Sequence, residues 1–293
     1  MTTVKNILVL TDFSENAKTA EKYALQLAIK TNANLILYNA YPFPPIDAIS
    51  GSVIWPHDTY HSMELLSISN LQSRVDELNE EVTKSKDDTH KPAISHLGDV
   101  GNVTGKLKEV VSNNHIWITI MGTKGEGFAN NLVFGSNVFN VLDAINCPVL
   151  IIPKNAELKV LNKIAYATDL RSTDLFIVQW LDEFCESLNA ELLITHVVPD
   201  FLTDQEFALS SRIIEKIYDS KFMKIHTAVF QGKNIAESLH EIMELQNVGL
   251  LAMHHRRYGF FDSLFHKSTS HKMIKHTEIP VLVFSDSDLY SKP

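Results

Sequence analysis

A glycine-rich stretch between residues 122 and 136 has the residue types and the spacing that bind phosphate. It reads GTKGEGFANNLVFGS, so Gly122, Gly125 and Gly135 follow the pattern Gly-x2-Gly-x9-Gly, and Ser136 comes directly after the last glycine. Because glycine has no Cβ, the backbone N–H groups of such a loop can converge on an anion. A helix beginning at Ser136 adds free N–H groups, and the serine hydroxyl can donate to a phosphate or reach a metal ion on it. The alternative, an ordinary strand-to-helix connection, explains two glycines more easily than this full spacing.

The segments around the loop predict a parallel sheet covered by helices. Residues 116–121 (IWITIM) form a nearly continuous apolar run, and residues 137–145 carry apolar side chains at helical spacing. A second apolar run, residues 7–10, is followed by a helical stripe that Ser14 can cap. Strands that are apolar throughout are typical of parallel sheets buried on both faces. Their alternation with helices predicts an α/β doubly wound fold with right-handed crossovers.

Two dipeptides stand where such a sheet binds its ligands. Thr11-Asp12 ends the first apolar run, and Met121-Gly122 ends the run before the glycine loop. Ligands of open α/β sheets bind beyond the carboxyl ends of the strands, at the point where the strand order reverses. The topology alone therefore directs attention to these residues.

The chain contains an internal duplication. Four apolar landmarks recur in the same order: residues 7–12 match 164–169, 35–40 match 192–197, 116–122 match 248–254, and 146–152 match 278–284. The early pairs are 157 residues apart and the late pairs 132, so the second copy lacks 25 residues from its middle. We therefore predict two tandem domains, residues 1–153 and 163–293, separated by a polar segment.

The composition excludes several classes of protein. The chain of 293 residues has a formal net charge of −9, which argues against a nucleic-acid or anionic-membrane binder. No apolar stretch approaches the roughly 20 residues that span a bilayer, and the N-terminus lacks a signal-peptide core. Cys147 and Cys185 are the only cysteines, which fits a reducing compartment, so we expect a cytoplasmic protein. The spacing of the late histidines, such as His266 and His271, does not favour a metal site.

These motifs together resemble the universal stress protein family, once per repeat along nearly the whole chain. The resemblance is carried by Thr11-Asp12-Phe13-Ser14, by the glycine loop, and by the strand that begins Cys147-Pro148-Val149. The glycine spacing is similar to that of the ATP-binding branch of the family. The resemblance implies, for each half, a five-stranded parallel sheet of order 3-2-1-4-5 with helices on both faces.

The resemblance also implies a nucleotide site in the first half, with ATP, alone or with Mg²⁺, as the ligand. Asp12 and the end of the second strand near Ala40 would hold the adenine and ribose side, and Lys124 lies inside the loop with a charge suited to phosphate. The full set of expected binding residues is Thr11, Asp12, Ala40, Met121, Gly122, Lys124, Gly125, Gly135, Ser136, Asn137 and Val138. The chain would act as a nucleotide-dependent sensor or regulator with a protein partner, and not as an enzyme. A non-nucleotide interaction scaffold with a vestigial loop and a slow ATPase are the alternatives.

The second half departs from the pattern. At the 132-residue offset His254, Arg257 and Lys267 replace the three glycines, and only Ser268 matches its counterpart. One interpretation is a degenerate copy kept for packing against the first half. The other is an altered anion pocket, since arginine can bind phosphate through two nitrogens. Its residues would be His254, His255, Arg256, Arg257 and Lys267.

Two further features concern assembly and partners. Each half ends in an apolar strand, residues 148–152 and 280–284, whose open edge needs cover. We expect the two strands to pair within the chain as an intramolecular pseudo-dimer, with a homodimer of chains as an alternative. Residues 41–60 are rich in proline and aromatic residues and predict either an ordered surface loop or a lid or partner-docking element beside the nucleotide. Residues 65–82 then predict an amphipathic helix.

Overall fold

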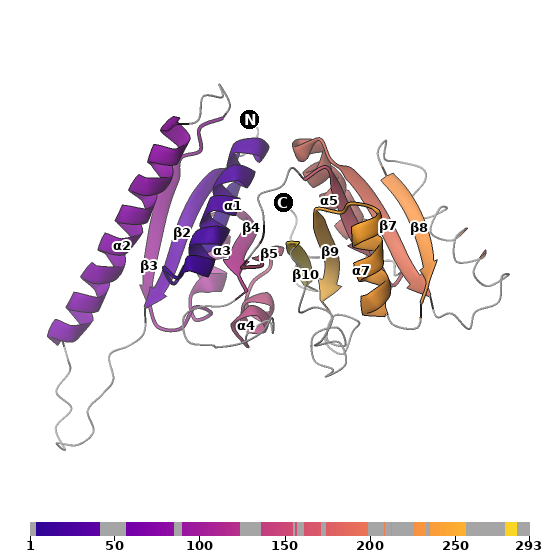
Figure 1. The fold of residues 1–293 in the computed structure, drawn as a ribbon. Helices are drawn as coiled ribbons and strands as arrows, with labels where there is room; N and C mark the ends of the chain where they lie inside the picture. Colours follow the sequence, from indigo (N-terminus) through magenta and orange to yellow (C-terminus); the bar gives the residue numbers. More distant parts are fainter. Residues whose placement is uncertain are drawn as a thin grey trace, which may run out of the picture.

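The computed structural model of the chain contains one sheet of ten strands, flanked by helices (Figure 1). It describes residues 4–41, 57–84, 90–123, 136–154, 156, 161–170, 174–198, 208, 212, 225–232, 235–255 and 279–285. The strands of the first half are β1 (Asn6–Leu10), β2 (Asn34–Tyr41), β3 (Ile94–Val100), β4 (Ile116–Gly122) and β5 (Val149–Ile152). Those of the second half are β6 (Lys163–Ala167), β7 (Glu191–Val198), β8 (Ile225–Gln231), β9 (Leu250–His255) and β10 (Val281–Ser285).

Each half has the predicted strand order. The sheet runs β3-β2-β1-β4-β5-β10-β9-β6-β7-β8, so the first half reads 3-2-1-4-5 and the second half repeats that order in mirror sequence. Neighbouring strands within a half are parallel. The prediction of two tandem doubly wound α/β units is therefore confirmed, while the exact boundaries at residues 1–153 and 163–293 stay predictions.

The two halves join through their last strands. β10 pairs with β5 in antiparallel register, with Val281 opposite Ile151 and Val283 opposite Val149. Figure 1 shows these two short strands meeting at the centre of the molecule. The pairing covers both apolar edges at once, as the sequence predicted, and makes a single continuous sheet.

Helices cover both faces of this sheet. In the described residues they are α1 (Glu15–Thr31), α2 (His57–Lys84), α3 (Leu107–Asn113), α4 (Ser136–Ala144), α5 (Asp174–Leu188) and α7 (Ile235–Leu245). α1, α2 and α5 share one buried apolar cluster, and α3, α4 and α7 share the other. Within the described ranges, no helix combines the length and the apolar character needed to cross a membrane.

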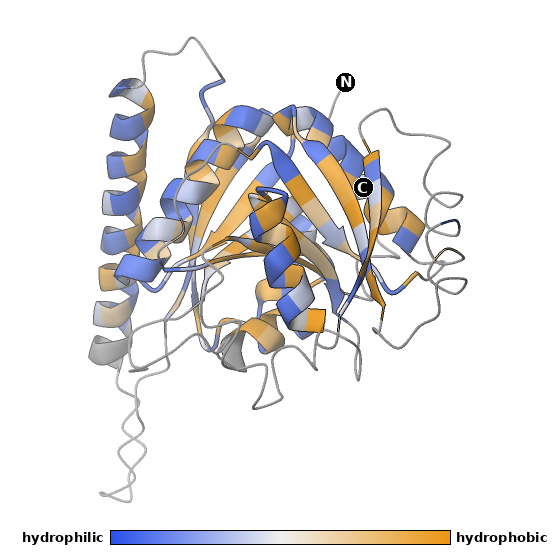
Figure 2. Cartoon of the chain, turned by 45° about the vertical axis from the view of Figure 1, so that its right-hand side comes forward, coloured by the Kyte–Doolittle hydropathy of each residue, from blue (hydrophilic) through white to orange (hydrophobic). Residues whose placement is uncertain are grey.

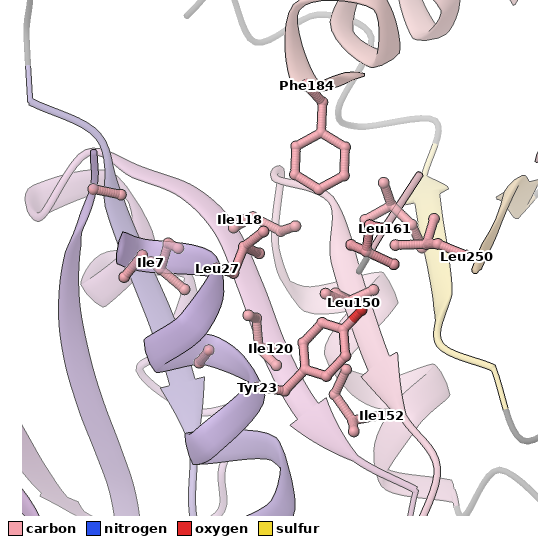
Figure 3. Packing of buried hydrophobic residues seen from close by; sticks show 14 of the residues in the cluster. Ile7, Tyr23, Leu27, Ile118, Ile120, Leu150, Ile152, Leu161, Phe184 and Leu250 are labelled. Carbon is pink, nitrogen blue, oxygen red and sulfur yellow. The ribbon is translucent and has the colours of Figure 1, made fainter. Parts of the chain in front are cut away.

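Each apolar cluster extends through both halves. Figure 3 shows Leu27 of α1, Ile118 of β4 and Leu150 of β5 in the same packed layer as Phe184 of α5 and Leu250 of β9. The inner strands are apolar on both sides because each side faces a layer of helices, whereas the edge strands β3 and β8 are only partly buried. The colouring of Figure 2 shows the same arrangement, with hydrophobic strands inside and helices whose outer faces are hydrophilic.

Local signals explain where the helices begin and end. The Ser14 side chain caps α1 by accepting a hydrogen bond from the Ala17 N–H at 3.3 Å, as predicted. Asn32 closes the helix in the left-handed conformation (φ 53°), and Asn189 closes α5 in the same way. The predicted helix over residues 65–82 is present as the longer α2, and α4 begins at Ser136. Residues 41–60, predicted to be a surface loop, a lid or a docking element, lie almost wholly outside the described residues.

Candidate functional site

The carboxyl ends of β1, β2 and β4 lie side by side at one edge of the first half. β1 is flanked by β2 and β4, with Leu10 opposite Tyr38 and Val9 opposite Ile120. The chain after β1 continues the pairing, because the Thr11 N–H donates to the Tyr38 carbonyl at 2.9 Å. Since β1 lies where the strand order changes direction, this edge is the topological switch point at which such sheets bind ligands.

Five of the predicted binding residues meet at this edge. Thr11 and Asp12 follow β1, Ala40 lies near the end of β2, and Met121 and Gly122 end β4. Asp12 is exposed and Ala40 is half-buried, so both can face a ligand. The Met121 side chain is buried in the cluster beneath α4, so it can offer a ligand little beyond its backbone.

The turn after β1 has an unusual backbone conformation. Phe13 has a φ of 65°, which is left-handed and uncommon for a bulky residue. Its N–H donates to Thr11 Oγ1 at 3.1 Å, and the Ser14 N–H donates to Asp12 Oδ1 at 3.1 Å. Such a conformation costs about 1–3 kcal/mol and persists only where the surroundings hold it. Backbone strain of this kind is common at functional sites.

A buried polar network holds this turn from inside the fold. Thr11 Oγ1 donates to Glu21 Oε1 at 2.6 Å, and Arg74 of α2 binds Glu21 Oε2 through Nε at 2.7 Å and Nη2 at 2.6 Å. Arg74 also pairs with Glu77 on its own helix. The Thr11 hydroxyl therefore supports the turn from within, and it is not directed to a ligand.

The Thr11 carbonyl is held by a second set of contacts. It accepts a hydrogen bond from Asn39 Nδ2 at 2.8 Å, and Asn39 Oδ1 accepts one from Ser67 Oγ of α2 at 2.7 Å. Sequence reasoning missed Glu21, Arg74, Asn39 and Ser67. Two of them left a signal in the sequence: Glu21 is an acidic residue inside the apolar stripe of α1, and Asn39 is a polar residue inside the apolar run of β2. Neither signal indicates which residue each side chain contacts.

The end of β4 at Gly122 packs closely against the start of α1. A Cβ on this residue would lie 3.1 Å from the carbonyl oxygen of Asn16, in the first turn of α1. That distance is tighter than nine in ten real Cβ contacts, so the Asn16 backbone would have to move by a few tenths of an ångström to admit a larger residue. The glycine therefore lets the end of β4 approach the start of α1 closely.

The remaining predicted residues belong to the loop and the start of α4. Val138 is fully buried in the cluster under α4, which leaves its backbone as the part able to meet a ligand. Ser136 and Asn137 form the first turn of α4, where N–H groups are free of helical partners. Lys124, Gly125 and Gly135, and the side chains of Ser136 and Asn137, lie outside the described part of the structure.

An aromatic hydroxyl lies close to the same edge. The Tyr38 hydroxyl donates to Asp99 Oδ2 of β3 at 3.5 Å, and Lys106 pairs with Asp99 Oδ1 at 2.9 Å. Burial, helped by the Asp99 carboxylate, raises the pKa of Tyr38 to about 12. Tyr38 is therefore neutral at physiological pH and acts as a hydrogen-bond donor.

The second half builds the same turn with different residues. Thr168 Oγ1 accepts from the Leu170 N–H at 2.8 Å and donates to Asp174, and Leu170 has a φ of 60°. Aligned on these threonines, Asp174 stands at the position of Ala17, and Val178 stands at that of Glu21. The carboxylate that binds the threonine thus comes from one helical turn earlier.

The end of β9 is packed where the first half has a glycine. Gly122 pairs with Ile152 across β4 and β5, and His254 pairs with Phe284 across β9 and β10, so the two residues are structural counterparts. His254 and His255 are buried, and the His255 ring lies 5.9 Å from the ring of Phe139 on α4. This end of the second half therefore packs against the first half. Arg256, Arg257, Lys267 and Ser268 lie outside the described residues.

The part of the chain that the structure describes holds no cluster of three or more His, Cys, Asp or Glu side chains arranged to bind a metal ion. Both cysteines are buried, and neither forms a disulfide. The described residues of the site offer hydrogen bonding and charge. These come from the Asp12 carboxylate, the backbone at the ends of β2 and β4, and the N-terminal turn of α4.

Comparisons with known proteins agree with this fold. A family model described as the universal stress protein family matches residues 3–153 and again residues 161–285. Over 297 residues the chain is 27% identical to Universal stress protein Slr1230 of Synechocystis sp.. The alignment covers 96% of this chain and 100% of that protein.

Solved structures are similar over the whole chain. The crystal structure of a universal stress protein from Archaeoglobus fulgidus matches with a TM-score of 0.72 and 18% identity, covering 96% of this chain and 98% of that one. A functionally unknown protein, PA1789 of Pseudomonas aeruginosa PAO1, matches with a TM-score of 0.59 and 13% identity, covering 98% and 94%. At these identities the likeness shows the shared fold.

Proposed function

The chain belongs to the universal stress protein family, a family of stress-response proteins, and from that premise we propose that its first half binds ATP. One observation supports this most directly. The complete glycine spacing belongs to the same half in which Asp12, Ala40 and Gly122 converge at the topological switch point of the sheet. The chain would use the bound nucleotide as a sensor or regulator acting on a protein partner in the cytoplasm.

In this proposal, some residues at this edge bind the nucleoside of ATP and others bind its phosphates. Asp12 and the backbone near Ala40 suit the adenine and ribose, because they offer hydrogen-bond acceptors and a backbone edge beside an exposed surface. The start of α4 suits the phosphates, because its first N–H groups and its dipole favour negative charge. Ser136 at that start is the residue that would reach Mg²⁺ if the ion accompanies ATP.

Binding is favoured over catalysis by the role of Asp12. Its carboxylate accepts from the Ser14 N–H. In the proposed arrangement it would meet the nucleoside end of the ligand, away from the γ-phosphate where water would have to be activated. We propose the second half as a packing partner, since His254 and His255 are buried and His255 contacts Phe139 of the first half. A slow ATPase and a non-nucleotide scaffold are the competing functions.

Calorimetric titration of the full chain with ATP, ADP, AMP and GTP, with and without Mg²⁺, tests the proposal. We expect one ATP per chain and weaker binding of GTP. Gly135→Val should abolish the heat of binding, and Lys267→Val, at the matching position of the second half, should leave it unchanged. Absence of binding in the parent would favour the scaffold. A stoichiometry of two would favour an anion pocket in the second half. Phosphate release at many turnovers would favour the ATPase.

A further inference from the structure

The hydroxyl of Thr11 is oriented by the groups on either side of it. A threonine hydroxyl has one proton to donate, and Thr11 donates it to Glu21 Oε1 at 2.6 Å. A lone pair then faces the Phe13 N–H, which donates to it at 3.1 Å. Because the bond to Glu21 fixes the direction of the hydroxyl, it also supports the left-handed conformation of Phe13. That conformation sets the place of Asp12, the residue between them.

Glu21 depends in turn on a helix that is distant in sequence. Arg74 lies 53 residues further along the chain and contacts Glu21 Oε2 through Nε at 2.7 Å and Nη2 at 2.6 Å. The Glu21 side chain is fully buried, and the Arg74 side chain is only 10% exposed. Since Arg74 holds Oε2, Oε1 is turned toward Thr11. The chain of contacts therefore runs from α2 through Glu21 and Thr11 to the turn that carries Asp12.

Stability alone does not account for this ion pair. The desolvation of two buried charges offsets most of their attraction, and hydrophobic residues of similar size often serve as well. The second half provides that comparison within the same fold, because Val178 is buried at the position of Glu21. A hydrophobic residue is therefore compatible with this place on the helix. What the ion pair adds is a directed acceptor for Thr11.

In the second half the corresponding threonine also binds a carboxylate. There Asp174 binds Thr168 from one turn earlier on α5, and Leu170 keeps the left-handed conformation. Both halves thus hold the turn by a threonine bound to an acid. In the first half that acid is Glu21, which Arg74 ties to α2.

We propose that Glu21 and Arg74 are positioning residues of the nucleotide site, which set Asp12 for the nucleoside end of the ligand. This inference rests on the proposed binding of ATP by the first half. Their loss should loosen the turn after β1 while leaving the phosphate-binding loop and α4 in place. It should therefore weaken the binding of a nucleotide more than the binding of its phosphate chain alone.

Two variants of the full chain separate positioning from packing. Glu21→Val/Arg74→Met removes both charges together, so no buried charge is left without a partner. Ala17→Asp/Glu21→Val/Arg74→Met then supplies the acid from the position that Asp174 occupies in the second half. The measurements are hydrogen exchange of the Phe13 amide without ligand, and the affinities for ATP and for inorganic tripolyphosphate. The Leu170 amide, bonded to Thr168 in the untouched half, is the internal control.

The double variant should exchange the Phe13 amide about tenfold faster and bind ATP about tenfold more weakly, as expected for one lost hydrogen bond. Leu170 exchange and tripolyphosphate affinity should stay unchanged. The triple variant should regain both the Phe13 protection and the ATP affinity. Unchanged Phe13 exchange and ATP affinity in the double variant would overturn the proposal. An equal loss of ATP and tripolyphosphate affinity would also overturn it, because it would indicate general loosening.

The proposal stays testable if the parent chain binds no ATP or if the double variant does not fold. If the parent chain binds no ATP, the proposed function fails, whereas Phe13 exchange still decides whether Glu21 and Arg74 hold the turn. If the double variant does not fold, Arg74→Lys can be measured in its place, because it keeps the positive charge and loses the bidentate contact with Glu21. That variant should raise Phe13 exchange severalfold with no change at Leu170, and an unchanged rate would overturn the proposal.

Discussion

The indole rings of Trp117 and Trp180 stack across the junction of the two halves, with their centroids 5.2 Å apart and their planes at 27°. Trp117 lies on β4 of the first half, and Trp180 lies on α5 of the second half. Phe184 and Phe284 extend this contact, and Lys5 Nζ lies 4.0 Å from the centre of the Trp117 ring. The halves are therefore joined by packed aromatic side chains as well as by the pairing of β5 with β10.

Trp180→Ala should lower the free energy of unfolding by about 2–3 kcal/mol, because it removes a partly buried ring and its stacking partners. Phe176→Ala on the same helix is the matched control. Phe176 is 63% exposed, so its removal should cost less than about 0.5 kcal/mol. Urea titration followed by circular dichroism measures both values, and equal losses would contradict a junction role for Trp180.

The isolated first half, Met1–Lys154, should self-associate. Its β5 edge is covered by β10 in the full chain, and without β10 an apolar strand with unpaired backbone groups faces water. Pairing with β5 of a second copy would restore the cover. Sedimentation velocity should show a dimer at micromolar concentration, while a monomer at high concentration would speak against the argument.

Gly122→Ala should both destabilise the fold and weaken ATP binding. The added Cβ would lie 3.1 Å from the Asn16 carbonyl oxygen, so β4 and α1 must shift, at a cost of about 1–3 kcal/mol. Gly249→Ala is a useful comparison, since its Cβ would meet the flexible end of the Leu161 side chain at 3.2 Å. Thermal melts and calorimetry report the two effects. A Gly122→Ala chain with parental stability and affinity would refute the close approach.

Arg74→Met alone should destabilise the chain by about 3–5 kcal/mol, because it leaves the buried carboxylate of Glu21 without its cation. Adding Glu21→Val to it should recover most of that loss, because no buried charge is then left without its partner. Urea unfolding of the parent, the two single variants Arg74→Met and Glu21→Val, and the double variant gives the coupling energy directly. Additive losses in the double variant would show that the two side chains act independently.

Alkaline pH should destabilise the chain through Cys185. Burial raises the pKa of this thiol from 9.0 to about 12, and the negative charge of the nearby Asp182 adds to the increase. The unfolded chain then ionises first, so the contribution of Cys185 to stability is complete below pH 9 and is lost as the pH rises toward 12. Tyr38, with its pKa raised to about 12, acts in the same direction from about pH 10.

Cys185→Ala should therefore flatten the fall in unfolding free energy between pH 9 and pH 12, even if it lowers the value at neutral pH. The slope removed should approach about 1.4 kcal/mol per pH unit, the value for one proton. Urea titrations at several pH values give the two curves. Parallel curves for the parent and the variant would show that the thiol does not contribute.

Much of the fold could be predicted from the sequence, because its signals are local or repeated. The apolar runs, the cap at Ser14 and the helical spacing of α1 each depend on residues within a few positions of one another. The duplication fixed the order of elements in the second half, and the apolar edges of β5 and β10 predicted their pairing. The convergence of Thr11 and Gly122 followed from the topology of parallel sheets.

The inner support of the site was decided only by the tertiary structure. Glu21 and Arg74 are 53 residues apart, and Asn39 and Ser67 are 28 apart. The local sequence around one residue of each pair therefore does not predict its hydrogen-bond partner. The contact between Gly122 and Asn16 likewise depends on how closely α1 packs on β4. Local patterns encode which side of an element is buried, because that depends on periodicity. Which buried polar groups meet depends on how α2 is placed against α1 and the sheet, and that placement is set by the packing of the whole core.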